Sequence, residues 1–200
     1  MSRGRCMFMK ECAGNPFCRS LRPKLREALC AKATLTYQKA KQTQMINSVN
    51  ANFEIIVKGI EFSFTVLEDG SQEGIQLLKS GDILGTHLLF ERLPFPVTHL
   101  LALTDVTRCN FPIYFIEDFF HDNRDFAQAL MKNLTLDHAA NLSNWVHMHS
   151  KNGPEKVAYV YKKLQKLDVD MNSITQEDLA LIAGVSRITV ARSMKDIYRK

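Results

Sequence analysis

The sequence has no long hydrophobic run, and this absence argues against a membrane helix. Its best apolar stretch, Val97 to Leu103, is interrupted by Thr98 and His99, whereas a membrane helix needs roughly 20 consecutive apolar residues. The basic N-terminus also lacks the apolar segment of roughly 7–15 residues that a signal peptide needs. Glycine and proline are sparse, at nine and six residues, which excludes collagen-like and disordered low-complexity chains. We therefore expect a globular protein in the cytoplasm, with no membrane partner.

Neither sign of charge dominates the chain, but positive charge dominates its two ends. The net charge is +5 in total, while residues 1–30, 31–150 and 151–200 carry +5, −4 and +4. A basic C-terminal segment is a modest indication of a polyanionic partner such as DNA. Solvated surface lysines would explain the same charge equally well.

Cysteine is rare outside the N-terminus. Four of the five cysteines fall in the first thirty residues, and the complete set is Cys6, Cys12, Cys18, Cys30 and Cys109. An odd number without a secretory signal argues against a disulfide framework, and a cytosolic group of this kind more often binds metal or senses redox state. Cys30 follows Leu29 in a predicted amphipathic helix, Leu21 to Ala33, so we interpret it first as a core or interface thiol.

Short apolar segments between Tyr37 and Phe115 predict β-strands. The segments are Phe53 to Val57, Glu61 to Leu67, Gly74 to Leu78, Val97 to Leu103 and Val106 to Phe111. Phe62, Phe64 and Val66 alternate with polar residues, and glycine-containing turns separate the segments. Several short strands at close spacing predict an antiparallel barrel or jelly roll.

The spacing of apolar residues changes beyond Pro112, where a long helix is predicted from about Asp122 to His149. Its apolar stripe consists of Phe126, Leu130, Leu134, His138, Leu142 and Trp145. A helix of this length with one stripe is typical of packing against a twin helix, so we predict that these six residues form a homodimer interface. Lys151 to Pro154 ends the helix, and a second helix, Glu155 to Leu167, follows.

The segment from Thr175 to Arg192 predicts a helix-turn-helix. Thr175 with Asp178 three residues later resembles a capping box, Gly184 permits the tight turn, and Ser186 caps the second helix. In this motif the second helix enters the major groove of DNA with its N-terminal side chains on the base edges. The pattern favours double-stranded DNA as a partner over a chance helical hairpin.

The second helix of this motif carries the candidate DNA contacts, which are Ser186, Arg187, Thr189, Arg192 and Lys195. Arg187 is placed to reach a guanine edge, whereas Arg192 and Lys195 suit phosphates or further bases. Ser186 and Thr189 suit a cap and a phosphate contact better than a catalytic role, and we do not expect an enzyme. A generic solvated basic face is the alternative interpretation.

A barrel, a long helix and a C-terminal helix-turn-helix, in this order, resemble the CRP/FNR superfamily of bacterial transcription regulators. The resemblance rests on Gly81 to Gly85, on Lys151-Asn152 with Glu155 to Ala158, and on Leu179 to Arg192, and it covers the chain from about Leu21 onward. It implies an α+β fold with a cyclic-nucleotide-binding-like antiparallel barrel, a homodimer on palindromic DNA, and RNA polymerase as a further partner. The implied domains are a cysteine-rich segment with the first helix at 1–30, a barrel sensor domain at 31–117, a dimerisation helix at 118–150 and a DNA-binding domain at 151–200.

The cysteines resemble those of the FNR-type oxygen sensors in this superfamily. Such sensors hold three cysteines before the first helix and a fourth in the barrel within a Cys-x-x-Pro segment, as in Cys109 to Pro112 here. The resemblance implies a [4Fe–4S] cluster that senses oxygen, nitric oxide or redox state, with the ligands Cys6, Cys12, Cys18 and Cys109. Because the spacing is C-x5-C-x5-C rather than C-x2-C-x5-C, Cys30 stays open as a replacement for Cys6.

The sequence also departs from the superfamily at three places. Members that bind cyclic nucleotides carry an Arg-Ser or Arg-Thr pair where this chain has Phe95 to Thr98, so we do not expect it to sense a cyclic nucleotide. Ile188 stands where FNR-type proteins have a glutamate that accepts from cytosine, which predicts a different DNA half-site. The sequence ends at Lys200, where the superfamily usually continues into a β-hairpin wing, so we expect fewer phosphate contacts.

Other chemistries stay open for the cysteines. Zinc would suit the same thiolates, and a disulfide between N-terminal cysteines, or between Cys18 and Cys109, would make a thiol-switch regulator. A haem sensor is disfavoured because no histidine has a distinctive axial-ligand context. A cupin-like metalloenzyme is disfavoured because the barrel segment holds only His87 and His99, without a His-x-His and carboxylate group.

Overall fold

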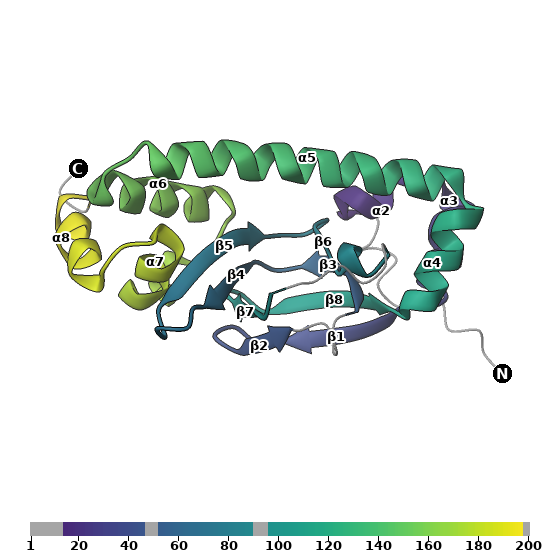
Figure 1. Ribbon diagram of the computed structural model, residues 1–200, viewed down its shortest axis with the longest axis horizontal. Coiled ribbons are helices and arrows are strands. Elements are labelled where there is room, and N and C mark those ends of the chain that lie inside the picture. Colours follow the sequence, from purple (N-terminus) through teal and green to yellow (C-terminus); the bar gives the residue numbers. More distant parts are fainter. Residues whose placement is uncertain (1–13, 47–51, 90–95, 198–200) are drawn as a thin grey trace.

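The computed structural model describes residues 14–46, 52–89 and 96–197 and shows an elongated molecule (Figure 1). One long helix, α5, runs along its upper edge, with strands beneath it and the C-terminal helices at one end. The helices are α2 (Pro16–Ser20), α3 (Pro23–Cys30), α4 (Ile113–Asp122), α5 (Arg124–His149), α6 (Gly153–Lys166), α7 (Gln176–Ala183) and α8 (Arg187–Ile197), with 3-10 turns at Thr86–Leu89 and Met171–Ser173. Among the described residues, no helix is long and apolar enough to cross a membrane.

The strands of the described chain form two antiparallel four-stranded sheets. They are β1 (Thr34–Gln38), β2 (Thr43–Ile46), β3 (Phe53–Lys58), β4 (Glu61–Val66), β5 (Gln72–Leu78), β6 (Ile83–Leu84), β7 (Thr98–Ala102) and β8 (Val106–Phe111). The first sheet has the order β1-β8-β3-β6 and the second has the order β2-β7-β4-β5. The predicted α+β class is therefore confirmed, with the barrel built as a β-sandwich. Strands β1, β2 and β6 were not among the predicted segments.

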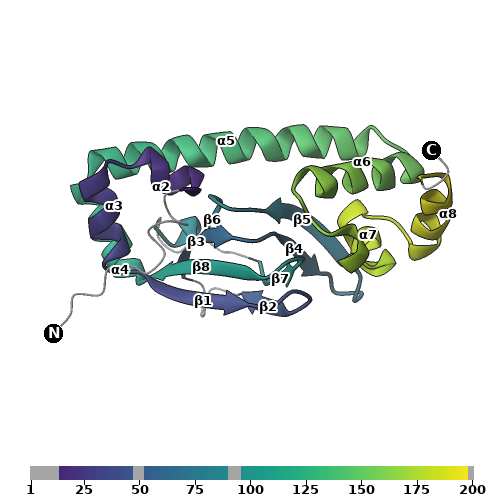
Figure 2. The same cartoon turned by 180° about the vertical axis from the view of Figure 1, so that it is seen from behind.

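Helices cover the outer face of the first sheet. Phe53 of β3 and Phe111 of β8 lie in one buried cluster with Phe17 of α2 and Phe126 of α5. The ring of Phe126 meets Phe17 and Phe119 edge-on, with centroid distances of 6.0 and 5.0 Å. Figure 2 shows α2 between α5 and the strands, so the N-terminal segment is part of this core.

The C-terminal helices cover the outer face of the second sheet. Phe62 and Phe64 of β4 share one buried cluster with Val160 of α6 and Val190 of α8. The cluster extends from the sandwich into all three C-terminal helices, so the barrel and the helix-turn-helix share a core. Such burial contributes roughly 25 cal/mol per Å² of apolar surface removed from water.

The predicted stripe of α5 does not face one way. Phe126 and Leu130 have no exposed surface, and Leu134 packs against the same cluster, so these three side chains face their own barrel rather than a second subunit. The exposed members of the stripe are His138, Leu142 and Trp145. The reason is geometric: a step of four residues turns a helix by about 40° more than one full turn, so a stripe of such steps winds around the helix. The predicted helix is also preceded by a separate one, since α4 ends before Asn123.

Candidate DNA-binding surface and sensor region

The helix-turn-helix forms as its local sequence predicts. The hydroxyl of Thr175 accepts from the backbone N–H of Asp178 at 3.0 Å, and the Asp178 carboxylate accepts from the N–H of Thr175 at 2.8 Å, which is a capping box. Helix α7 ends at Gly184, whose φ of +59° lies in the left-handed region that glycine adopts without strain. The hydroxyl of Ser186 accepts from the N–H of Thr189 at 3.2 Å and caps α8. These predictions are confirmed.

Buried side chains fix the angle between α7 and α8. Ala183 and Val190 have no exposed surface, and Leu179 and Met194 are buried in the same cluster. Val185, in the turn, is half-buried against it. Because both helices bury their inner faces, the outer face of α8 is held rigidly at the surface.

The outer face of α8 is basic. Arg187, Arg192 and Lys195 are exposed, and Ile188 beside them is 65% exposed. This face lies at one end of the molecule (Figure 1). An exposed isoleucine between cations suits an apolar contact, such as one with a thymine methyl group. Sequence reasoning placed Ile188 only as a departure from the FNR pattern and missed it as a surface group.

Three of the predicted DNA contacts have partners within the protein. The hydroxyl of Thr189 lies 3.0 Å from that of Ser186, and its methyl group lies so close to Gly153 that an added Cβ there would meet it at 2.9 Å. Thr189 therefore packs at the junction between α8 and α6, and Ser186 caps α8. Arg187 pairs with Glu177 of α7 at 3.0 Å, but both side chains are exposed and the pair is weak.

Polar and close contacts join the helix-turn-helix to the sandwich. Lys41, in the turn after β1, forms an ion pair with Asp178 of α7. At Gly74 of β5, an added Cβ would lie 2.5 Å from the ring of Phe62 and 3.3 Å from the carbonyl oxygen of Leu181. Glycine at this position therefore allows β5 and α7 to approach closely.

A second row of α5 residues is exposed at the spacing of a helix pair. Positions 131, 135, 138, 142, 145 and 149 follow one another in steps of four and three residues, and all six are exposed. Met131, Leu142 and Trp145 in this row are 52%, 54% and 57% exposed. Leu136, 61% exposed, lies on the opposite side of the helix. The row leaves an apolar helix face without a partner from the described chain.

Two of the three described cysteines share a buried cluster on one side of the sandwich. Cys18 of α2 and Cys109 of β8 are each 4% exposed and belong to the same buried cluster, whereas Cys30, at the end of α3, is half-buried. Asn15, missed by sequence reasoning, positions Cys18: its side chain accepts from the Cys18 N–H at 3.0 Å and donates to the Ile56 carbonyl at 2.8 Å. The predicted ligands Cys6 and Cys12 lie outside the described residues. Within the described ranges, no group of three metal-ligating side chains occurs.

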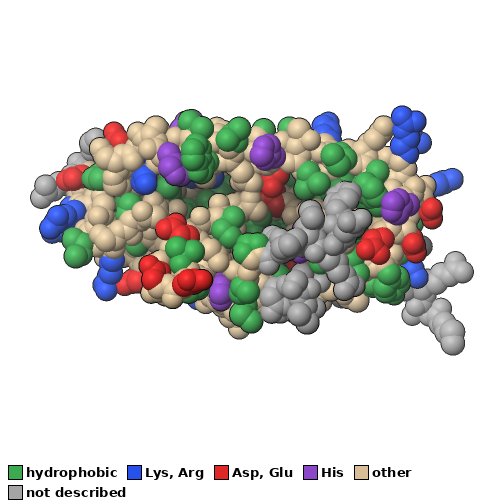
Figure 3. Space-filling view, in the orientation of Figure 1, with side chains coloured by type: hydrophobic (Ala, Val, Ile, Leu, Met, Phe, Trp, Pro, Cys, Tyr) green, Lys and Arg blue, Asp and Glu red, His purple; other side chains and the backbone are tan. Residues whose placement is uncertain are grey.

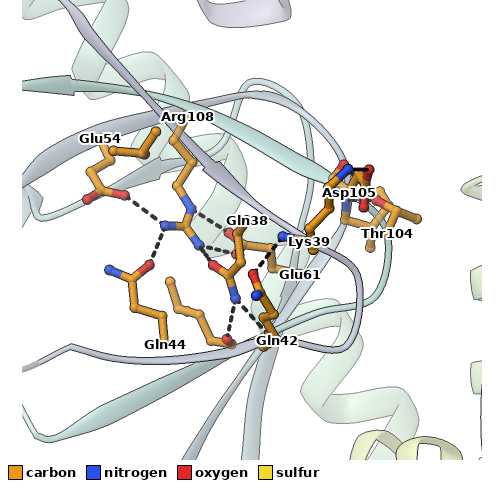
Figure 4. A network of polar contacts seen from close by, with 12 residues as sticks. Gln38, Lys39, Gln42, Gln44, Glu54, Glu61, Thr104, Asp105 and Arg108 are labelled. Atoms are coloured by element: carbon orange, nitrogen blue, oxygen red, sulfur yellow. Dashed lines mark hydrogen bonds and ion pairs between the residues drawn. The ribbon is translucent and has the colours of Figure 1, made fainter.

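A buried cation with two carboxylates lies between the sheets (Figure 4). Arg108 donates twice to Glu61, once at 2.9 Å from Nε, donates to Gln44 at 2.8 Å, and lies 3.5 Å from Glu54. Burial raises the pKa of Glu54, the charge of Arg108 opposes this, and the charge of Glu61 adds to it. Burial alone would lower the pKa of Arg108, but hydrogen bonds and charge from Glu61 outweigh it and raise that pKa. The guanidinium is neutralised here and is not available to a phosphate ligand.

A cavity of about 210 Å³ lies in the sandwich. Its described lining includes Ile46, Leu84 and Leu100 with Thr98 and His87. Burial lowers the pKa of His87, which favours its neutral form. A cyclic phosphate would find no Lys or Arg among these described lining residues.

Comparisons with known proteins identify the fold. No family model matches the sequence, and no curated protein matches it. A solved structure described as a transcriptional regulator of the Crp/Fnr family from Eubacterium rectale has a TM-score of 0.72 at 12% identity, covering 92% of this chain and 86% of that one. The c-di-GMP-responsive regulator CLP of Xanthomonas campestris gives 0.70 at 12% identity, covering 89% and 92%. FixK2 of Bradyrhizobium japonicum gives 0.64 at 14% identity, covering 84% and 85%. At these identities the likeness shows the fold, which is that of the CRP/FNR regulators.

Proposed function

We propose that this chain is a dimeric DNA-binding transcription regulator that reads DNA with α8. One observation carries the proposal: Arg192 and Lys195 are exposed on the side of α8 away from Val190 and Met194, which anchor the helix in the core, and Arg187 is exposed at its N-terminal end. A helix held in this way presents charge and hydrogen-bond donors to a groove without first having to order itself. The likeness to Crp/Fnr-type regulators supports the same function.

The exposed row on α5 supports a homodimer. Its heptad spacing matches a two-helix seam, and its apolar members would be buried by the same row of a second copy. Two copies of α8 related by a two-fold axis would address half-sites roughly 34 Å apart, one turn of DNA. The predicted target is therefore a palindromic duplex, and RNA polymerase remains a proposed further partner.

DNA selection tests this proposal. The full chain is incubated with a pool of random-sequence duplexes, and the bound fraction is amplified and sequenced over several rounds. We expect a two-fold symmetric motif with half-sites one helical turn apart, and we expect Arg192→Ala to lose most of the enrichment. A pool that stays random after several rounds contradicts the proposal.

We propose that the regulator senses oxygen or redox state through its cysteines, at the place where α2 packs against the sandwich. The support is that Cys18 and Cys109, from distant parts of the sequence, share one buried cluster. Both thiols are compatible with a [4Fe–4S] site, for which Cys6 and Cys12 would supply the remaining thiolates. Such a group would supply an oxygen-sensitive link between the N-terminal segment and the barrel. Release of that link would loosen the packing of α2 against α5, which leads to the DNA-binding end.

A thiol switch between Cys18 and Cys109 is the second candidate, favoured by the same shared cluster. Anaerobic purification with a visible spectrum and with iron and sulfide assays separates the two candidates. About four iron and four sulfide per chain, with colour that bleaches in air and is absent in Cys109→Ser, supports the cluster. A colourless, iron-free protein whose mobility shifts after peroxide treatment without reductant supports the disulfide. A protein with neither property contradicts both.

A further inference from the structure

One large apolar side chain lies on the basic outer face of α8. Ile188 is 65% exposed, although the helix buries Val190 and Met194 on its opposite side. Ile188, Arg192 and Lys195 follow one another in steps of four and three residues, so they share one side of the helix. Figure 3 shows Lys and Arg side chains, with hydrophobic side chains among them, at the end of the molecule where α8 lies. The isoleucine therefore lies among the cations that are proposed to meet DNA.

The side chains next to Ile188 leave it open to a partner. Arg187, the preceding residue, pairs with Glu177 of α7 at 3.0 Å, which draws its guanidinium toward the other helix. Ala191, about one turn further along the same side, is half-buried and ends at its β-carbon. A partner that approaches α8 from outside can therefore contact the isoleucine directly.

The position of Ile188 is set before any partner binds. Its helix is anchored by Val190 and Met194 in the core, and a β-branched side chain in a helix strongly prefers one χ1 rotamer. Helical side chains also tilt toward the N-terminus, which is the end of the second helix that a helix-turn-helix places on the base edges. Little conformational freedom is left for a contact to remove, so a contact made here keeps most of its binding energy.

The edges of the base pairs offer an isoleucine one apolar target in the major groove. The other groups there are hydrogen-bond donors and acceptors, whereas thymine presents a methyl group at C5. Cytosine at the same place lacks this methyl group and presents its N4 amino group, which an isoleucine could bury only without a hydrogen-bond partner. Ile188 therefore gains apolar contact from a thymine and loses by facing a cytosine.

We propose that Ile188 contacts the C5-methyl group of one thymine in each half-site and makes α8 select thymine over cytosine there. The inference rests on the proposed DNA binding and identifies a base-specific contact within it. The group that is recognised is a methyl group at C5 of a pyrimidine. For this reason 5-methylcytosine replaces thymine at that position better than cytosine does.

The test starts from the duplex that DNA selection recovers. Each thymine of one half-site is replaced in turn with deoxyuridine, which keeps the base pair and removes only the methyl group. Binding of the full chain is measured by fluorescence anisotropy at constant ionic strength. We expect one replacement to weaken binding about fourfold, because about one buried methyl group is lost. Ile188→Ala should bind the thymine duplex more weakly and should bind the thymine and deoxyuridine duplexes equally.

Two controls isolate the methyl contact. Leu136→Ala shortens an aliphatic side chain that is 61% exposed on α5, so it should bind within about twofold of the original chain and keep the full effect of deoxyuridine. At the sensitive position, 5-methylcytosine opposite guanine should bind more tightly than cytosine opposite guanine, and Ile188→Ala should not distinguish the two. Thermal melting shows whether each variant is folded, and Ile188→Val, which removes a single methyl group, keeps the test decisive if Ile188→Ala is not.

Three results would overturn the inference while leaving DNA binding in place. The first is a selected duplex in which no deoxyuridine replacement changes the affinity. The second is a methyl effect that stays at full size in Ile188→Ala, which would assign the contact to another side chain. The third is equal binding of the cytosine and 5-methylcytosine duplexes by the original chain. A selection that recovers no motif overturns the DNA-binding proposal itself, and this inference with it.

Discussion

Arg108 is a buried cation of the described sandwich. It is 2% exposed and lies between two buried carboxylates, with Glu61 making the closer and doubled contact. Taking three charges out of water is costly, so the group is stable only while its partners remain in place. Neither carboxylate was expected from sequence, because Glu54 and Glu61 fall in strand segments where alternation alone predicts surface positions.

Removing the closer carboxylate should therefore be far more damaging than removing the distant one. Glu61→Gln leaves a buried guanidinium without its main partner and should cost about 3–5 kcal/mol of unfolding free energy. Glu54→Gln loses only a 3.5 Å contact and should cost less than about 1.5 kcal/mol at neutral pH. Urea unfolding of both variants measures the difference, and equal costs would contradict the assignment of Glu61 as the main partner.

The pH dependence of the Glu54 variant follows from the direction of its pKa. Burial raises the folded-state pKa of Glu54, so its contribution to stability is complete below the unfolded value and is lost as pH rises through the folded value. Glutamine has no proton to lose. The stability of Glu54→Gln relative to the original chain should therefore increase as the pH rises from about 4 to about 7. A difference that is flat or decreases over this range would show that Glu54 is not destabilised by burial.

Residues whose role is set by local sequence were predictable, and those set by packing were not. The Thr175 capping box and the Gly184 turn depend on neighbours within a few positions, and both are present. The residues next to Thr189 in the sequence do not determine how α6 packs on α8. Its contact with Gly153 could therefore not be predicted. Its methyl group packs at the helix junction, and its hydroxyl bonds to that of Ser186.

Helix α5 changes its role along its length. Near its start, Phe126, Leu130 and Leu134 pack against the chain's own sandwich, whereas a second row from Met131 onward is exposed. A sequence stripe cannot distinguish an intrachain partner from a second copy, because both bury the same residue types. The spacing of the stripe residues already indicated that they do not all share one side. Repeated four-residue steps wind around a helix, whereas alternating three- and four-residue steps stay on one side.

A charged substitution on the exposed row should separate the subunits. Leu142→Asp places a charge in the proposed seam, whereas Leu136→Asp makes the same change at a 61% exposed position on the opposite side of α5. We expect analytical ultracentrifugation to show a dimer for the original chain and for Leu136→Asp, and a monomer for Leu142→Asp. Dimers that persist equally in both variants would place the interface elsewhere.

The strands, too, were predictable only where the local sequence was sufficient to indicate them. Short apolar segments located β3, β4, β5, β7 and β8, whereas β1, β2 and the two-residue β6 were missed and form by pairing with distant partners. Cys109 illustrates the consequence. Its Cys-x-x-Pro context suggested a ligand segment, and the structure places it inside β8 opposite Leu35 and Ile55. Because Cys109 is buried within a strand, other metal-ligating side chains can reach its thiol only from the face of the sheet that α2 covers.

At the scale of the whole molecule, the sandwich and the C-terminal helices are joined by more than a linker. One buried cluster contains Phe62 and Leu103 of the sandwich together with Leu164 and Val190 of the C-terminal helices. A ligand or redox change that shifts the sandwich would therefore act on α8 through packed side chains. The order of the sandwich, the long helix and the C-terminal helices was predictable from sequence. The shared core was not, because leucines on the surface and leucines at an interface cannot be told apart in a sequence.

The shared core predicts cooperative unfolding. Far-UV circular dichroism, which reports all helices and strands, and the fluorescence of Trp145 in α5 should give coincident urea transitions at one protein concentration. If the C-terminal helices were an independent unit, part of the dichroism would be lost at a separate urea concentration. Two resolved transitions would contradict the shared core.

The most direct test of the central claim is the equilibrium binding of a fluorescently labelled duplex, measured by anisotropy across a range of salt concentrations. The original chain should lose affinity steeply with salt, and Arg192→Ala and Arg187→Ala should each weaken binding and make the salt dependence shallower by roughly one phosphate contact per subunit. Lys24→Ala removes the same charge from α3, at the other end of the molecule (Figure 1), and should bind like the original chain. Equal binding by all four proteins, or no salt-dependent binding at all, would contradict the assignment of α8 as a DNA-reading helix.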